Sequence, residues 1–203
     1  MEGIVLEVAA RVGLIVLICR CVWKNEVMGS ELKSGFECSV CGKWHDTLPL
    51  SYSVKAPLAA TRVQIYELEQ RVVITADQCV IDGRDFYLRG RIPVPVIGLD
   101  EPFIWGVWAE VSPKNFIRTN DLWNVVGRET EPAFPGWLDT ELFLFGNTVN
   151  LEVSVQTQIV GRRPHFTAVD QDHPLGLEQR AGITMQRVVE IAERITHKQD
   201  SQD

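Results

Sequence analysis

The most regular alternation of apolar and polar residues in the chain lies in TVNLEVSVQTQIV, residues 148–160. Val149, Leu151, Val153 and Val155 fall on one face of this segment, and polar residues fall between them. A period of two is the pattern of a half-buried β-strand. Because strands with one solvated face are typical of antiparallel sheets, we predict an antiparallel sheet that contains this strand.

A second segment, RVVITADQCVIDGRDFYLRGRIPVPV at residues 71–96, predicts a β-hairpin. Residues 72–75 and 80–81 are β-formers, Asp82-Gly83 is a turn dipeptide, and residues 86–88 form the returning strand. Pro93 and Pro95 then hold the chain extended and mark an edge or an exit from the sheet.

Aromatic residues dominate the next predicted strand, PFIWGVWAEVS at residues 102–112. Trp105 and Trp108 are three positions apart, so they face opposite sides of the strand. Either both indoles are core residues, or one of them lies in a groove or at an interface. The region that follows, through Trp123 and FPGWLD at 134–139, is rich in Gly and Pro and is expected to be irregular.

The last element is predicted to be a helix, in GITMQRVVEIAERITHK at residues 182–198. Thr184 is the expected N-cap, and the apolar residues Val188, Ile191, Ala192 and Ile195 repeat with helical spacing. Strands followed by a terminal helix, without alternation of strands and helices, indicate an α+β fold. We therefore predict a mainly antiparallel sheet with a C-terminal helix packed on it and an N-terminal CxxC knuckle.

Residues 4–23, IVLEVAARVGLIVLICRCVW, are the one segment that could contact a membrane. Their uninterrupted apolar run covers eight residues, Val12 to Cys19, whereas a membrane span needs about 20. This segment is an extension upstream of a start at Met28, a membrane-associating helix, or a packed core helix. We divide the chain into an N-terminal apolar extension, 1–27, and a single α+β domain, 28–203, and expect deletion of residues 1–27 to leave the fold unchanged.

Charge and cysteine content narrow the classes of partner. The formal net charge is −7 and no run of Lys and Arg occurs, so nucleic acid is not an expected partner. Five cysteines, an odd number, do not suggest a secreted disulfide framework, and a cytoplasmic location is the simpler prediction. The expected partner is a protein or a small molecule of unknown identity, and membrane contact is expected only through residues 4–23.

The strongest candidate chemistry lies in FECSVCGKWHD, residues 36–46. Cys38 and Cys41 can point at one metal ion, and Gly42 permits the turn that this requires. Zinc takes four such ligands, so the spacing indicates half of a site, with His45 and Cys79 as the candidates that complete it. A redox pair and buried cysteines that never meet are the alternatives.

A second polar segment is HFTAVDQDHP, residues 165–174. His165, His173, Asp170 and Asp172 are close enough in sequence to form a hydrolytic metal site or an acid–base pair. The other interpretation, which we favour, is a surface loop bounded by prolines in which Asp172 and His173 cap turns.

The segments CSVCGKWH, DQCVIDGRDFYLRGRIPVPV, FIWGVWAEVSPKNF, GWL, GRRPHF and DHPLGLEQRAGIT together resemble the bacterial family called domain of unknown function 2199. The resemblance runs from about Phe36 to Arg194, and the residues before Met28 have no counterpart in it. It implies that the family pattern includes a set of cysteine, histidine, tryptophan, proline and glutamine positions. These are Cys38, Cys41, His45, Cys79, Trp105, Trp108, His173, Pro174 and Gln179. No activity and no catalytic residue follow from it.

The sequence therefore favours a cytoplasmic binding or interaction domain that contains a structural zinc knuckle and has no catalysis of its own. One alternative is a metal-dependent enzyme in which His173, Asp170 or Asp172 acts near the metal. The other is a membrane-tethered binding domain. Four protein ligands would close the zinc tetrahedron and argue for a structural role, whereas three ligands beside a polar pocket would argue for catalysis.

Overall fold

The computed structural model describes residues 31–32 and 35–200, so the extension predicted at 1–27 lies outside the described residues. The strands are β1 (Glu31–Leu32), β2 (Phe36–Glu37), β3 (Trp44–His45), β4 (Leu48–Pro49), β5 (Ser51–Ser53), β6 (Val72–Ile74), β7 (Gln78–Ile81), β8 (Asp85–Val94), β9 (Phe103–Val111), β10 (Phe134–Leu138), β11 (Glu152–Gln156) and β12 (His165–Ala168). The helices are α2 (Leu58–Thr61), α3 (Leu68–Arg71), α4 (Pro113–Asp121), α5 (Pro174–Ala181) and α6 (Met185–Asp200), with 3-10 turns η1 (Arg128–Thr130) and η2 (Phe143–Phe145).

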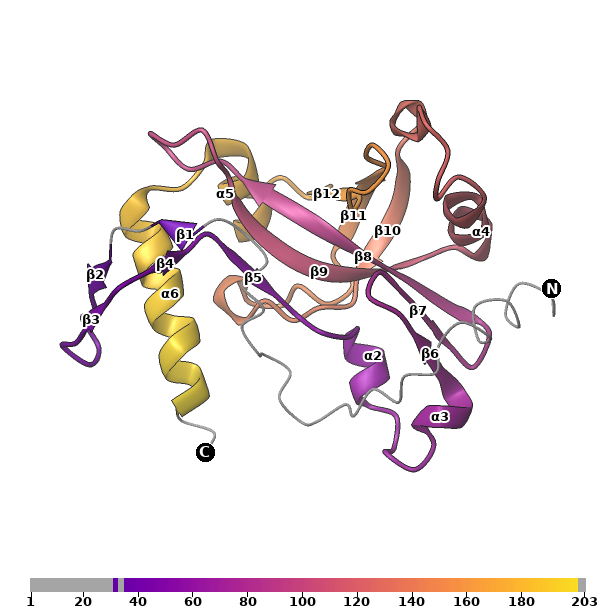
Figure 1. Cartoon of the computed structure of the whole chain (residues 1–203), viewed down its shortest axis with the longest axis horizontal. Helices are drawn as coiled ribbons and strands as arrows, with labels where there is room; N and C mark the ends of the chain where they lie inside the picture. The colour runs from indigo at the N-terminus through magenta and orange to yellow at the C-terminus, as the bar shows by residue number, and fades with distance from the viewer. Residues whose placement is uncertain (1–30, 33–34, 201–203) are drawn as a thin grey trace.

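The long antiparallel pair β8–β9 forms the centre of the sheet (Figure 1). The two strands pair along their whole length, from Phe86 opposite Val111 to Val94 opposite Phe103. Each strand then has one outer edge, and each outer edge carries two further strands. β7 and β12 pair with β8, while β5 and β10 pair with β9.

Five of the strands close into a ring. β9, β10, β11 and β12 pair in succession as antiparallel neighbours, and β12 returns to β8 in parallel at His165 opposite Arg91. The Arg91 amide donates to the Pro164 carbonyl, with 2.9 Å between N and O, at the same junction. β5 also runs parallel to its neighbour β9. The predicted mainly antiparallel sheet is therefore right only in part, because the sheet is mixed and barrel-like.

Two cores lie on opposite faces of the sheet. The larger core contains Trp105, and α6 packs into it through Val188, Ile191, Ala192 and Ile195. The smaller core contains Trp108, against which Cys79, Tyr87 and Ala60 of α2 pack. Trp105 and Trp108 are both fully buried but belong to different cores, so the prediction that they face opposite sides of one strand is confirmed.

Local sequence signals were accurate where they were strong. The predicted hairpin turns at Asp82 and Gly83, which both have a positive φ. The predicted helix α6 begins after Thr184, and the Thr184 hydroxyl oxygen accepts a hydrogen bond from the Arg187 amide at 3.2 Å. The strand predicted at 148–160 is shorter, at β11, because Asn150 adopts a φ of 65° that extended strands exclude. FPGWLD was expected to be irregular and is instead β10.

Candidate metal centre

The knuckle, residues 36–45, is a short antiparallel pair, with Phe36 of β2 opposite His45 of β3. In the turn between the strands, the Gly42 amide donates to the Cys38 carbonyl and the Cys38 amide donates to the Lys43 carbonyl, at 2.8 and 2.9 Å. Gly42 has a φ of 66°, which glycine adopts without Cβ strain. The Phe36 ring stacks on the His45 imidazole with 5.0 Å between ring centroids. The turn and the stacked ring fix both the thiols and the imidazole.

Four side chains converge at the knuckle: Cys38, Cys41, His45 and His197. One ligand atom from each of them lies within 4.8 Å of all the others. The Cys38 Sγ is 3.1 Å from His197 Nε2, and the Cys41 Sγ is 3.7 Å from His45 Nε2. In a tetrahedral zinc site, bonds of about 2.3 Å to sulfur and 2.0 Å to nitrogen place such atoms roughly 3.5 Å apart. The two observed distances lie on either side of that value and every pair lies within 4.8 Å, so the four side chains could hold one metal ion.

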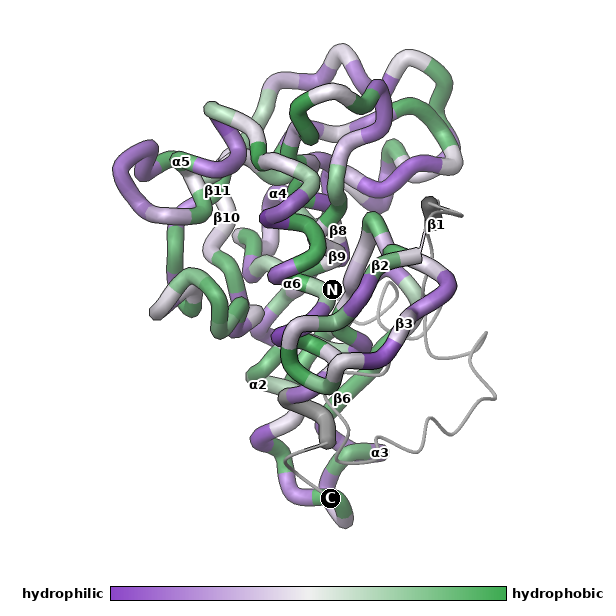
Figure 2. Tube along the Cα trace, turned by 90° about the vertical axis from the view of Figure 1, so that its left-hand side faces the viewer, coloured by the Kyte–Doolittle hydropathy of each residue, from purple (hydrophilic) through white to green (hydrophobic). Residues whose placement is uncertain are grey.

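The knuckle is held against the C-terminal helix by a second contact. The Ser39 hydroxyl donates to Glu193 Oε2 at 2.9 Å, and the Ser39 amide donates to Glu193 Oε1. Glu193 lies one turn before His197 on α6 and is only 7% exposed. Both residues therefore project from the side of α6 that lies away from its apolar stripe. Figures 1 and 2 both place β2 and β3 beside α6, so the helix lies between the core and the knuckle.

The structure does not bring Cys79 to this cluster. Cys79 lies in β7, fully buried beside Trp108 and Tyr87. Figure 1 shows β7 across the sheet from the knuckle. Burial, and to a lesser extent the charge of Asp139, raise the pKa of the Cys79 thiol to about 12. Its burial disfavours the thiolate that a metal would bind, and its place in the smaller core keeps it away from the cluster.

His197 was not predicted from the sequence, and it is the fourth member of the cluster, where Cys79 was expected. Its signal was the pair Glu193 and His197, spaced i, i+4 on the face opposite the apolar stripe of the last helix. That face is polar in the sequence, yet Glu193 is buried under the knuckle. Because zinc binds both cysteine and histidine, the histidines outside the knuckle were candidates for the fourth ligand as much as the cysteines were.

The segment HFTAVDQDHP has structural contacts. His173 is the N-cap of α5, and its Nδ1 accepts a hydrogen bond from the Leu175 amide at 3.2 Å. The carboxylate that closes the preceding turn belongs to Asp170, which accepts from the amides of Asp172 and His173. Capping by His173 was expected, but the capping aspartate is Asp170 instead of Asp172. His165, in β12, is half-buried.

Two acidic residues, Asp139 and Glu110, lie beside the smaller core. Asp139 Oδ2 accepts a hydrogen bond from the Ala59 amide at 2.8 Å, yet burial raises the pKa of the Asp139 carboxyl. Burial, together with the charges of Asp85 and Asp139, likewise raises the pKa of Glu110. These carboxylates therefore oppose folding at neutral pH.

We expect Asp139→Asn to raise the free energy of unfolding at pH 7 and to lose that advantage at acidic pH. The folded protein holds the Asp139 proton more tightly than the unfolded chain, so stability falls as pH rises from the unfolded pKa through the folded one. Asparagine carries no charge and its oxygen can still accept from the Ala59 amide. Urea unfolding at several pH values, with the exposed Asp100→Asn as control, measures the difference. An equal gain for both variants at pH 7 would contradict the argument.

The fold and the site define a mixed α+β protein with a barrel-like sheet and a Cys/His cluster between an N-terminal knuckle and a C-terminal helix. The chain belongs to the family described as "Uncharacterized protein conserved in bacteria (DUF2199)", whose sequence model matches residues 37–183. The resemblance seen in the sequence is thereby confirmed. The matched range includes Cys38, Cys41 and His45 and ends before His197. No curated protein and no solved structure matches the chain.

Within the described ranges, 31–32 and 35–200, no helix has the length and apolar character that crossing a membrane requires. Residues 4–23, where membrane contact was predicted, lie outside those ranges.

Proposed function

We propose that Cys38, Cys41, His45 and His197 bind one structural zinc ion, and that the protein is a cytoplasmic binding or interaction protein without catalysis of its own. The observation that carries the proposal is the convergence of the four ligand atoms within 4.8 Å. Cys38 and His197 are 159 positions apart in the chain, so no local turn accounts for their contact.

The donor set favours zinc over harder cations. Thiolate sulfur and imidazole nitrogen are the ligands that zinc takes in structural sites, whereas calcium and magnesium take oxygen. Four protein ligands complete the tetrahedron and leave no coordination position for a water or a substrate. A reducing compartment such as the cytoplasm keeps the two thiols available for the metal.

The position of the cluster supports a structural role. An ion held by Cys38, Cys41 and His45 on one side and by His197 on the other would fasten the knuckle to α6. The Ser39–Glu193 contact already joins the same two elements. The knuckle would then be a rigid surface feature rather than a mobile strand pair.

The outer surface of the knuckle supports a role in binding. Among the described residues, Val40 and Trp44 are 61% and 64% exposed, although both are apolar and lie on this small element. Tryptophan is enriched among the residues that contribute most to protein–protein affinity. A fixed knuckle with an exposed indole suits contact with a protein partner.

The alternatives receive less support from the described contacts. The enzyme hypothesis needed His173, Asp170 or Asp172 near a metal. His173 instead caps α5, and Asp170 closes the turn before it. A redox role for the pair would require the CxxC to lie at the start of a helix, where the thiolate is stabilised. Here the CxxC forms the turn between β2 and β3.

Metal analysis of the purified full chain, prepared without chelator, tests the proposal. We expect one zinc per chain in the wild type and in Cys79→Ala, and a loss of zinc in Cys38→Ser and in His197→Ala. Circular dichroism would confirm that the variants remain folded. Wild-type protein without stoichiometric zinc would overturn the proposal, and zinc lost from Cys79→Ala but kept in His197→Ala would overturn the ligand set.

A further inference from the structure

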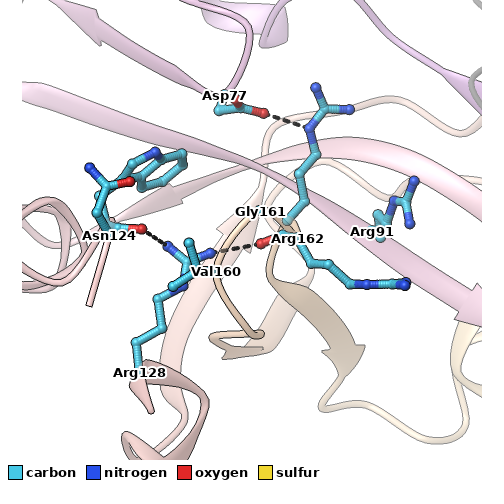
Figure 3. Close-up of a pocket in the computed structure, with 9 residues that line it drawn as sticks. Asp77, Arg91, Asn124, Arg128, Val160, Gly161 and Arg162 are labelled. Carbon is cyan, nitrogen blue, oxygen red and sulfur yellow. Dashed lines mark hydrogen bonds and ion pairs between the residues drawn. The ribbon is translucent and has the colours of Figure 1, made fainter. Parts of the chain in front are cut away.

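A cavity of about 580 Å³ opens where β8, the segment before β12 and the region around η1 meet (Figure 3). Its volume is in the range of pockets that bind small organic molecules, roughly 300–1,000 Å³. The lining residues are Asp77, Arg91, Trp123, Asn124, Arg128, Val160, Gly161, Arg162 and Arg163. No residue of the Cys/His cluster is among them.

The cavity concentrates positive charge in an acidic protein. Its lining contains four arginines and one carboxylate, whereas the chain as a whole has a formal net charge of −7. Two of the arginines have structural partners. Arg128 donates to the carbonyls of Trp123, Gln158, Ile159 and Arg162, and Arg163 Nε pairs with Asp77 Oδ1 at 2.6 Å. These contacts fix the wall of the cavity.

Arg91 and Arg162 are different, because neither guanidinium group has a hydrogen-bond acceptor or a carboxylate partner among the described residues. Figure 3 shows both side chains extending to the same side, away from Asp77. Arg91 comes from the central strand β8 and is half-buried. Arg162 is exposed, so the two cations lie at the open side of the cavity, where an anion from solvent can reach both of them.

Burial and neighbouring positive charges also act on the pKa values of Arg91 and His165. Burial, followed by the charges of Arg163 and Arg162, lowers the pKa of Arg91. Burial, followed by the charges of Arg91 and Arg162, also lowers the pKa of the neighbouring His165. The electrostatic potential at this wall of the cavity is therefore positive.

We infer that this cavity binds a small organic anion that carries a phosphate group, with Arg91 and Arg162 as the residues that hold the phosphate. A guanidinium fork matches the oxygens of a phosphate, and the two charges of a phosphate balance the two arginines. The cavity is larger than a phosphate alone. Trp123 and Val160, which also line it, offer apolar surface to the rest of the ligand.

Nucleic acid is not the expected ligand of this cavity. An extended polyanion needs a basic stripe along the protein surface, and the sequence contains no basic run. The positive charge here is confined to one concave site, which suits a small ligand.

Isothermal titration calorimetry with pyrophosphate, at constant ionic strength, tests the inference on the full-length protein. We expect saturable binding of one pyrophosphate per chain, weakened at least tenfold in Arg91→Gln and in Arg162→Gln. Arg180→Gln is the matched control, because it removes one exposed arginine from α5, outside the cavity. Its affinity should equal that of the wild type. Arg91→Lys, which keeps the charge and loses the fork, should lie between the wild type and Arg91→Gln.

A second measurement distinguishes binding in the cavity from general attraction. Because Arg91 and Arg162 lower the pKa of His165, an anion bound to them should raise it, and NMR titration of the His165 ring with and without pyrophosphate would detect the shift. The other histidines serve as internal controls. The inference is overturned if millimolar pyrophosphate does not bind, if Arg180→Gln weakens binding as much as Arg91→Gln, or if His165 does not respond.

Discussion

Removal of the proposed zinc ion by a chelator is expected to free the knuckle and the C-terminal part of α6 while the closed sheet remains folded. The ring β8–β12 has its own large apolar core, so it does not depend on the metal for burial. The knuckle has few buried apolar residues and is joined to α6 mainly by Ser39 and by the cluster itself. Under the zinc proposal, its stability is therefore expected to come largely from the metal site.

Amide hydrogen exchange measures this effect element by element. Structural zinc contributes many kcal/mol to small metal-bound modules, so protection in residues 36–45 should fall by a factor on the order of 100 or more after chelation. Protection in β8 and β9 should change little. As a control, chelator added to His197→Ala, which is expected to lack the metal, should produce no further change. Loss of protection throughout the sheet would show that the zinc supports the whole fold.

The second large effect is expected from Gly90→Ala, at the junction that closes the ring. A Cβ at position 90 would lie 2.3 Å from Cζ of Phe166, whose ring is fully buried in the larger core. Because the ring is buried among other core side chains, the variant must displace the ring or distort β8 or β12. Such overpacking typically costs about 1–3 kcal/mol of unfolding free energy.

Gly136→Ala is the matched control, because the nearest atoms to its Cβ, Glu110 O and Val155 Cγ2, are each 3.1 Å away and need shift only slightly. Urea unfolding should show a clearly larger loss for Gly90→Ala than for Gly136→Ala. Phe166→Leu in the Gly90→Ala background should recover part of the loss, since the smaller side chain vacates the space. Equal losses at the two glycines would mean that the β8–β12 junction is not tightly packed.

Much of the fold was predictable because its signals are local. The Asp82-Gly83 turn, the Thr184 cap and the apolar stripe of α6 each depend on residues within a few positions of one another. Trp105 and Trp108 face opposite sides of β9, and this follows from strand geometry alone. These predictions needed no knowledge of the rest of the chain.

The parts that could not be predicted depend on contacts between distant segments. β10 contains Pro135 and Gly136, which weaken any local strand signal. It forms because β9 and β11 supply partners on both sides. The parallel closure of β12 on β8 has no sequence signature, and neither does the approach of α6 to the knuckle. His197 was missed for that reason, since three candidate ligands are local to the knuckle and the fourth, on α6, is 159 positions from Cys38 in the sequence.

The order of the four cluster residues along the chain determines when, during protein synthesis, each of them becomes available to a metal. Cys38, Cys41 and His45 leave the ribosome before any strand of the ring, and His197 leaves after the last of them. A nascent chain therefore offers a metal three ligands and one open coordination position. The fourth ligand arrives only when α6 has docked on a folded sheet. Zinc captured early would stay exchangeable with the metal-buffering molecules of the cell, and tight retention would begin with completion of the fold.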